Sequence, residues 1–420
     1  MAEKQNTPEI RFEGFTDPWE QRKWSEYVSI STDMVDPRSG NYDNLPHVGP
    51  GNMESFTGRL YDNVNTVKDD ALISGKFHFN PGDIIYGKIN PQLGKYTYAQ
   101  FEGLASADAY VLNGKNGLTQ EFLFGILQTK AFFDYSVSVS MRSGMPKINR
   151  DELNAFEFLA PNESEQRAIG DILLKLDDLI TLHQRKHDKL CTLKKSMLDK
   201  MFPKPGETEP EIRFEGFTDP WEQRKLGDCF EFLKNNTLSR ADLNGENGTA
   251  RNVHYGDILI KFGDCLDGER SDLPFITDDT VLPKFAGSIL REGDVIFADT
   301  AEDEAAGKCV ELRKLPKEPT ISGLHTIPAR PRFPFGSGYL GHYLNSDAYH
   351  RQLLPLMQGI KVISVSKAAL QDTQVRFPGL SEQTAIGAAL SEIDNLITLH
   401  QRKLELLRNI KKSLLDRMFV

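Results

Sequence analysis

Two short loops in the sequence combine cations with small polar residues. Residues 141–150 and 358–368 each contain at least two cations and no acid. Cations contact phosphates, and hydroxyl or amide side chains can hydrogen-bond to base edges in DNA grooves. The pattern predicts nucleic-acid contacts, with an ordinary solvated loop as the alternative. The candidate DNA-contacting residues, including weaker ones outside these loops, are Lys88, Asn90, Gln92, Lys95, Arg142, Ser143, Lys147, Asn149, Arg150, Lys261, Lys308, Lys361, Ser364, Ser366 and Lys367.

The sequence offers little support for chemistry carried out by the chain itself. It contains no G-x-x-x-x-G-K-[ST] loop, no G-x-S-x-G, no H-E-x-x-H and no Asn-Pro-Pro-aromatic motif, and we find no G-x-G-x-x-G following a strand. The four cysteines are widely spaced and indicate reduced thiols. We therefore expect no catalytic residue, no metal site and no bound cofactor. A divergent nuclease or methyltransferase site stays open as an alternative.

The candidate residues need a framework, and the sequence contains one in duplicate. Residues 164–202 and 381–419 align without gaps and are identical at 24 of 39 positions. Apolar residues recur in both copies in alternating steps of four and three, which is typical of a coiled-coil seam. Each helix would be roughly 50–55 Å long, which suits a spacer. The seam or partner-docking residues are Leu176, Ile180, His183, Leu190, Met197, Ile393, Ile397, His400, Leu407 and Leu414.

Two histidines occupy equivalent seam positions. His183 and His400 have the chemistry of metal ligands or pH switches. A polar residue in a coiled-coil seam more often fixes the register of the helices. We favour that role for both histidines, and a register or docking role for Lys194 and Lys411.

A second repeat makes the chain a tandem duplication. The leader Pro8–Lys23 recurs letter for letter at Pro210–Lys225, and we expect its aromatic residues to pack onto a helix end. Two large copies favour a pseudo-two-fold arrangement. The predicted segments are a leader at 1–23, a first domain at 24–160, a central helix at 161–202, a linker and repeated leader at 203–225, a second domain at 226–378 and a C-terminal helix at 379–420.

The two segments between the repeats mix short strands with helices, which predicts two globular α/β domains in an α+β protein. Helical stretches are expected near 118–135 and 338–357. The predicted turn-and-strand stretches are Asn80–Ile89, Tyr255–Phe262 and Arg291–Ala298, with final strands at Ala155–Leu159 and Thr373–Phe377.

Charge limits how such a protein binds nucleic acid. The chain has 420 residues and a net charge of −10, which argues against a non-specific binder. Residues 24–160 hold 11 Lys and Arg against 16 Asp and Glu, and residues 226–378 hold 17 against 21. Any DNA surface is therefore local, and affinity should depend on partners. Without an apolar signal or membrane-length run, we expect a cytoplasmic protein with no membrane association.

Together these features resemble the specificity subunit of type I restriction–modification systems, over the whole chain. The resemblance is carried by the leader Arg-Phe-Glu-Gly-Phe-Thr-Asp-Pro-Trp-Glu-Gln-Arg-Lys and by the strand starts Gly-Asp-Ile-Ile and Gly-Asp-Val-Ile. It is also carried by the helix starts Glu-Gln-x-Ala-Ile-Gly and the helix ends Lys-Lys-Ser-x-Leu-Asp-x-Met-Phe. Four motifs duplicated in one order are more specific than any one of them.

The resemblance implies a division of labour. The variable segments would be target-recognition domains that each read one half of a bipartite, asymmetric sequence in double-stranded DNA. The helices would pair as an antiparallel coiled coil that separates the domains, sets the spacer and docks two methyltransferase subunits. Those subunits would carry S-adenosylmethionine and the adenine-methylation chemistry, and restriction subunits would add ATP- and Mg-dependent translocation and cleavage. The chain itself would not be an enzyme. A coiled-coil adaptor joining two protein-binding domains is the alternative.

Overall fold

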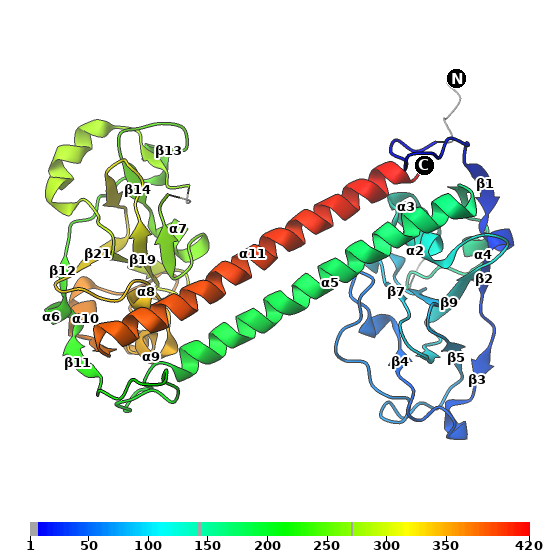
Figure 1. Ribbon diagram of the computed structural model, residues 1–420, viewed down its shortest axis with the longest axis horizontal. Helices are drawn as coiled ribbons and strands as arrows, with labels where there is room; N and C mark the ends of the chain where they lie inside the picture. Colours follow the sequence, from blue (N-terminus) through cyan, green and yellow to red (C-terminus); the bar gives the residue numbers. More distant parts are fainter. Residues whose placement is uncertain (1–6, 142–143, 270–271) are drawn as a thin grey trace. The chain divides into compact units, whose positions relative to one another are not determined.

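The computed structural model describes residues 7–141, 144–269 and 272–420. The chain forms two compact units, one made of Met1–Lys186 with His400–Val420 and the other of His187–Leu399. Each unit contains one globular domain and a segment of both long helices, α5 (Glu163–Lys200) and α11 (Leu380–Met418) (Figure 1). The predicted α+β class with two long repeated helices is confirmed.

Two four-stranded sheets form the domain of the first unit. The first sheet has the order β2 (Val28–Ile30), β9 (Ala109–Gly114), β6 (Ile84–Gly87) and β7 (Tyr96–Tyr98), all antiparallel. The second has the order β3 (Met34–Val35), β5 (Lys76–Phe79), β8 (Gly103–Ala105) and β4 (His47–Val48). The helices of this domain are α1 (Trp24–Tyr27), α2 (Gln120–Gln128), α3 (Lys130–Ser140) and α4 (Arg150–Asn154).

The second unit has a related plan with a five-stranded main sheet. Its main sheet has the order β12 (Phe230–Phe232), β21 (Thr326–Pro331), β17 (Val295–Ala298), β19 (Cys309–Lys314) and β15 (Cys265–Asp267). The smaller sheets are β13 (Leu243–Asn244), β16 (Phe275–Ile276), β14 (Arg251–Val253) and β20 (Thr320–Ser322), and the pair β18 (Thr300–Ala301) and β22 (Ile363–Ser364). The helices are α6 (Leu226–Cys229), α7 (Tyr255–Ile260), α8 (Tyr339–Asn345), α9 (Asp347–His350) and α10 (Lys367–Asp372).

One strand prediction is wrong. In the stretch predicted as a turn and a strand, residues 255–260 form α7 instead, because the residues before Ile258 favour a helix start. The His254 ring accepts a hydrogen bond from the Gly256 amide at 3.2 Å, and the buried Asp257 carboxylate follows in the first turn. Side-chain capping and an early acid both stabilise a helix N-terminus. The strands predicted within Asn80–Ile89 and Arg291–Ala298 are confirmed as β6 and β17.

Each repeated leader pairs with the strand that leads into its long helix. Strand β1 (Glu20–Lys23) lies antiparallel to β10 (Glu157–Ala160), and β11 (Glu222–Lys225) lies antiparallel to β23 (Gln374–Phe377) in the same register. The leader is therefore part of each domain.

The long helices run antiparallel within each unit. In the first unit the Lys411 ammonium contacts the Asp177 carboxylate, and His183 Nδ1 lies 2.8 Å from His400 Nδ1. In the second unit Lys194 Nζ lies 2.5 Å from Asp394 Oδ1. The repeat offset of 217 residues relates His183 to His400 and converts the pair Asp177–Lys411 into Asp394–Lys194. The duplicated helix thus pairs with its own copy.

The predicted seam residues face inward. All ten are buried or half-buried, and none is exposed. Leu414 packs against the core of the first unit, and Met197 packs against the core of the second. None of the helices in the described part of the chain is both long and apolar enough to cross a lipid bilayer.

Buried polar groups join each long helix to its domain. Glu165 is buried on α5 and accepts two hydrogen bonds from the leader's Arg11, at 2.8 and 2.6 Å. Glu382 on α11 receives the same pair from Arg213, at 2.9 and 2.7 Å. A bidentate arginine–carboxylate pair fixes orientation as well as distance. This geometry explains why the Glu-Gln at both helix starts accompanies the repeated leader.

A glycine lets each long helix approach its domain closely. A Cβ on Gly387 would lie 2.3 Å from Ser337 O and 2.8 Å from Tyr339 N at the start of α8. A Cβ on Gly170 would lie 2.4 Å from Glu121 Cβ at the start of α2. Both clashes involve backbone or backbone-proximal atoms that cannot rotate away.

We predict that Gly387→Ala destabilises the second unit, because the added methyl group forces α11 away from α8. Overpacking of this kind costs about 1–3 kcal/mol. Gly379→Ala is the matched control, because a Cβ there meets nothing within 4 Å. Hydrogen–deuterium exchange at residues 339–345 should rise in Gly387→Ala and stay unchanged in the control. Equal exchange in the two variants would contradict the close-packing role.

Candidate nucleic-acid interface

Three predicted cations come together in the first unit. The Ile148 amide donates to Lys88 O at 3.0 Å, which aligns the segment before α4 with the end of β6. Lys88 Nζ lies 5.3 Å and the Arg150 guanidinium 5.6 Å from the centre of the Tyr110 ring, within cation–π range. Lys147 is exposed beside them. The result is a local positive surface on an acidic domain.

The electrostatics of Lys88 report this crowding. Burial lowers the pKa of Lys88, and the charges of Lys147 and Arg150 lower it further, while Asp108 opposes the shift. Arg150 also has a structural task, because it donates to Ile30 O at 3.0 Å and to Ser31 O at 2.6 Å. The cluster therefore presents charge from a fixed position.

The other predicted residues of the first domain have local partners. Lys95 Nζ donates to Met53 O, and Gln92 Nε2 donates to Asn90 Oδ1 at 3.4 Å. Asn149 forms a capping box with Glu152 at the start of α4. The remaining two candidates, Arg142 and Ser143, lie outside the described residues. Their role stays a prediction, as does DNA contact by the others.

The predicted loop of the second domain is also held by contacts within its own domain. The Gln358 and Ser364 amides each donate to the other's carbonyl, at 2.9 and 2.8 Å, and Lys361 is exposed between them. Ser366 caps α10 by accepting from Ala369 N at 3.1 Å. Lys367 Nζ lies 5.1 Å from the centre of the Phe232 ring. The loop tip is therefore held by backbone pairing.

Two weaker candidates of the second domain already contact other groups of the protein, although Lys261 is exposed. Lys308 Nζ donates to the carbonyls of Leu259 at 3.1 Å and Phe262 at 3.2 Å, and burial lowers its pKa. Lys261 lies 3.3 Å from the buried Asp257 carboxylate. The sequence shows these cations but not the groups that bind them.

A polar hollow lies beside the loop of the second domain. Its volume is about 240 Å³, and its lining includes Asn235, Asp299, Thr326, Ser366 and Lys367. Sequence reasoning did not single out Asn235 or Asp299, because it searched for cations. The Gly-Asp turns and the alternating strands gave no signal for an acid at this place.

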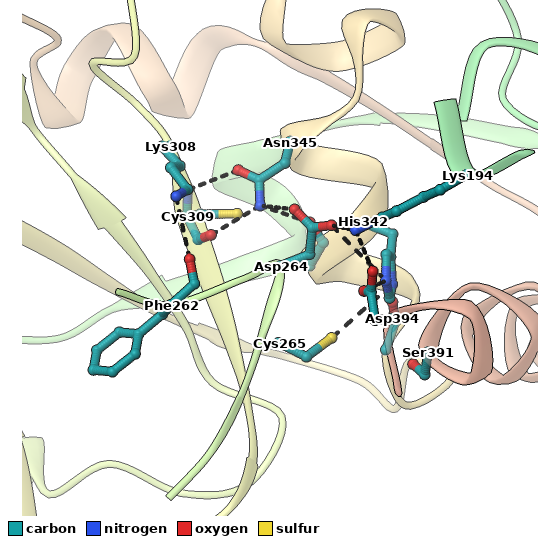
Figure 2. Close-up of polar contacts among 12 residues, drawn as sticks. Lys194, Phe262, Asp264, Cys265, Lys308, Cys309, His342, Asn345, Ser391 and Asp394 are labelled. Atoms are coloured by element: carbon teal, nitrogen blue, oxygen red, sulfur yellow. Dashed lines mark hydrogen bonds and ion pairs between the residues drawn. The ribbon is translucent and has the colours of Figure 1, made fainter. Parts of the chain in front are cut away.

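A four-residue polar cluster fixes both long helices on the second domain (Figure 2). Lys194 Nζ from α5 lies 2.5 Å from Asp394 Oδ1 on α11 and 2.7 Å from Asp264 Oδ2 in the domain. The fully buried His342 of α8 places Nε2 at 2.9 Å from Asp394 Oδ2 and Nδ1 at 2.5 Å from Gly338 O. Two acids thus meet one lysine and one histidine.

Opposite charges shift the pKa values of Lys194 and Asp394 in this cluster. Burial lowers the pKa of Lys194, but Asp264 and Asp394 raise it by more. Burial raises the pKa of Asp394, but hydrogen bonding from His342 and the Lys194 charge produce a net lowering. Asp264, His342 and Asp394 are also groups that bind metal ions. Here the Lys194 ammonium already lies against both carboxylates and supplies the cation.

The expectation that no G-x-G-x-x-G follows a strand is wrong. Gly336–Gly341 has these letters; it follows β21 and runs into the first turn of α8. The Gly338 and Gly341 amides donate to the two oxygens of Glu311, at 2.6 and 2.9 Å, and the Gly336 amide donates to Gln383 Oε1 at 2.9 Å. The buried Glu311 carboxylate thus accepts the hydrogen bonds of backbone amides that would bind phosphate in a nucleotide site. The motif serves packing.

Comparison with known proteins agrees with this architecture. Residues 18–191 match the family model described as the type I restriction modification DNA specificity domain. The specificity subunit of the type I restriction enzyme EcoDI from Escherichia coli is 34% identical over 151 residues, which cover 36% of this chain and 33% of that protein. Residues 18–191 therefore resemble a type I DNA specificity domain, and the chain is similar to type I specificity subunits.

Two further specificity subunits match over most of their length. The MjaVIII specificity subunit of Methanocaldococcus jannaschii is 23% identical over 350 residues, which cover 80% of this chain and 75% of that protein. The crystal structure of the type I restriction–modification S subunit from M. genitalium has a TM-score of 0.64 and 13% identity, covering 99% of both chains. At this identity the structural match shows a shared fold. In this chain, the two unlike domains and the duplicated helices are the parts whose role in DNA recognition can be tested.

We predict that Lys194→Met loosens the second unit, because it leaves two partly buried carboxylates without their shared cation. Breaking such a pair costs up to about 3–5 kcal/mol when fully buried, and less at the partial exposure here. Hydrogen–deuterium exchange should rise at residues 339–345, which contain His342. Lys195→Met is the control, because the Lys195 side chain is exposed. Unchanged exchange in Lys194→Met would contradict the anchoring role.

Proposed function

We propose that this chain is the DNA-reading subunit of a type I restriction–modification complex, with each domain reading one half of a bipartite, asymmetric target. The observation that carries the proposal is the equivalent placing of unlike loops in the two domains. The segments before α4 and α10 are held by the same backbone pairing, yet one presents Lys147 and Arg150 and the other Lys361 and Lys367. Unlike readers on a duplicated frame suit an asymmetric target.

The charge distribution supports a reader that works within a complex. Phosphate contacts supply much of the affinity of DNA-binding proteins, and their number determines the dependence on salt. This chain is acidic overall, with few exposed cations at each candidate surface. The chain should therefore bind DNA weakly when it is alone and tightly when partner subunits add further DNA contacts.

The proposal assigns the chemistry to other subunits. Two methyltransferase subunits, docked on the antiparallel helices, would carry S-adenosylmethionine and methylate adenine. Restriction subunits would use ATP and Mg for translocation and cleavage, in the cytoplasm where the target DNA lies. The helices would set the number of base pairs between the half-sites, as subunit geometry does in simpler dimeric DNA binders.

The test is methylome sequencing of a host that carries this chain and its modification partner. The proposal expects one bipartite motif with two different half-sites and a fixed spacer. The purified complex should bind that motif in preference to a scrambled duplex, with affinity falling as salt rises. A complex that assembles but shows no sequence preference would refute the proposal.

We predict that exchange of residues 24–160 for the corresponding domain of another specificity subunit changes only one half-site. The second half-site and the spacer should remain, because the second domain and both helices are unaltered. Methylome sequencing of the hybrid measures all three features. An unchanged motif would contradict the assignment of one half-site to each domain.

We predict that Lys147→Gln weakens binding of the complex to all sequences and reduces the slope of log affinity against log salt by about one, as expected for loss of one phosphate contact. Lys68→Gln is the matched control, because Lys68 is an exposed lysine of the same domain outside the loop. Salt titrations of the two variants should differ. Equal slopes would remove Lys147 from the interface.

A further inference from the structure

Lys88 and Asp299 occupy the same position in the two domains. The Lys88 amide donates to Asp108 O at 3.0 Å, and the Asp299 amide donates to His325 O at 3.0 Å. Lys88 O accepts from Ile148 N at 3.0 Å, and Asp299 O accepts from Val365 N at 2.8 Å. Each residue directly follows its central strand, β6 or β17. The backbone is equivalent, and the charge is reversed.

The residues around this position also differ between the two domains. In the first unit, the Tyr110 hydroxyl donates to Ile148 O at 3.2 Å, and its ring lies within cation–π range of both Lys88 and Arg150. In the second unit Ile327 stands in the strand register of Tyr110, because it pairs with Phe297 as Tyr110 pairs with Tyr86. The shorter side chain leaves the hollow of about 240 Å³ beside Asp299.

The hollow has a defined hydrogen-bonding character. Thr300 Oγ1 donates to Asp299 Oδ1 at 2.7 Å, and His325 Nδ1 lies 3.3 Å from the same oxygen. Both contacts are made to the same carboxylate oxygen, Oδ1. The rest of the polar lining comes from two segments. Asn235 follows β12, and Ser366 and Lys367 lie at the start of α10. A partly exposed carboxylate repels phosphate, so its use at a DNA surface is to accept hydrogen bonds.

We propose that Asp299 in this hollow reads an exocyclic amino group on a base of the second half-site, either cytosine N4 or adenine N6. This inference rests on the proposed DNA-reading function. Both amino groups face the major groove as donors, and carboxylate side chains accept from them. At the equivalent place the first domain presents Lys88, which can only donate. The two domains therefore select opposite hydrogen-bonding partners at one shared position.

The experiment uses the complex of this chain with its modification partner and duplexes that contain the methylated motif. Each adenine of the second half-site is replaced in turn by purine, which lacks N6, and each cytosine by pyrimidin-2-one, which lacks N4. One replacement should weaken binding of the wild-type complex by about tenfold, the loss expected for one specific base contact. The base type at that position distinguishes the two amino groups.

Three variants connect that loss to Asp299. Asp299→Ala should bind the unmodified duplex about tenfold more weakly and show no further loss when the amino group is removed. Asp299→Glu keeps a carboxylate and should retain sensitivity to the amino group. Glu302→Ala removes an exposed acid three residues away and should behave as the wild type. Unfolding curves of the complexes establish that each variant is folded.

The outcomes separate this inference from the function beneath it. If Asp299→Ala and the wild type lose affinity equally at every replaced base, Asp299 reads no amino group and the inference is wrong. Sequence-selective binding would then still stand. If the wild-type complex shows no preference for the motif, the proposed function and the inference fail together.

Discussion

The aromatic side chain that follows each long helix packs into the domain of the other repeat. Phe419, at the end of α11, stacks on Phe122 with ring centroids 5.1 Å apart and meets Trp19 edge-on at 6.2 Å. Phe202, two residues after α5, meets Tyr339 edge-on at 5.8 Å, and Tyr339 in turn meets the leader's Trp221 at 6.2 Å. Such pairs add about 0.5–1.5 kcal/mol each beyond area burial. Each domain core is therefore complete only when the helices run antiparallel.

Buried polar groups convert that packing into a single register. Apolar seams tolerate slippage by a heptad, but an ammonium buried beside a carboxylate does not, because an unpaired buried charge is costly. The duplicated pairs Asp177–Lys411 and Asp394–Lys194 use the same two sequence positions twice. In the second unit the pair is extended by Asp264 and His342, so the domain itself takes part. The ion pairs between the long helices are thus duplicated, whereas the polar contacts of Asp264 and His342 with these helices belong to the second domain.

The sequence predicts the frame well and the reading surfaces only in part, and physical reasons explain the difference. Helix pairing depends on periodicity, which is visible in a linear sequence, and duplication doubles the signal. The segment at 255–260 is misread because helix capping by His254 outweighs the β-propensity of Ile-Leu-Ile. Lys308 is named as a DNA contact because the sequence cannot show that two backbone carbonyls bind its ammonium. The proposed base contact Asp299 is not among the sequence candidates, because an acid contradicts the simple expectation of a basic interface.

The reversal of charge between Lys88 and Asp299 follows from the separation of frame and surface. Both residues sit at the end of a central strand whose backbone hydrogen bonds are satisfied in the same way, so the fold places no demand on either side chain. The neighbouring side chains also differ, because the Asp108 carboxylate lies near Lys88 and the His325 imidazole lies near Asp299. This exchange inverts the hydrogen-bonding character of the position, because an ammonium only donates and a carboxylate accepts. Duplication supplies two identical positions, and this exchange makes them chemically unlike without disturbing the cores that hold them.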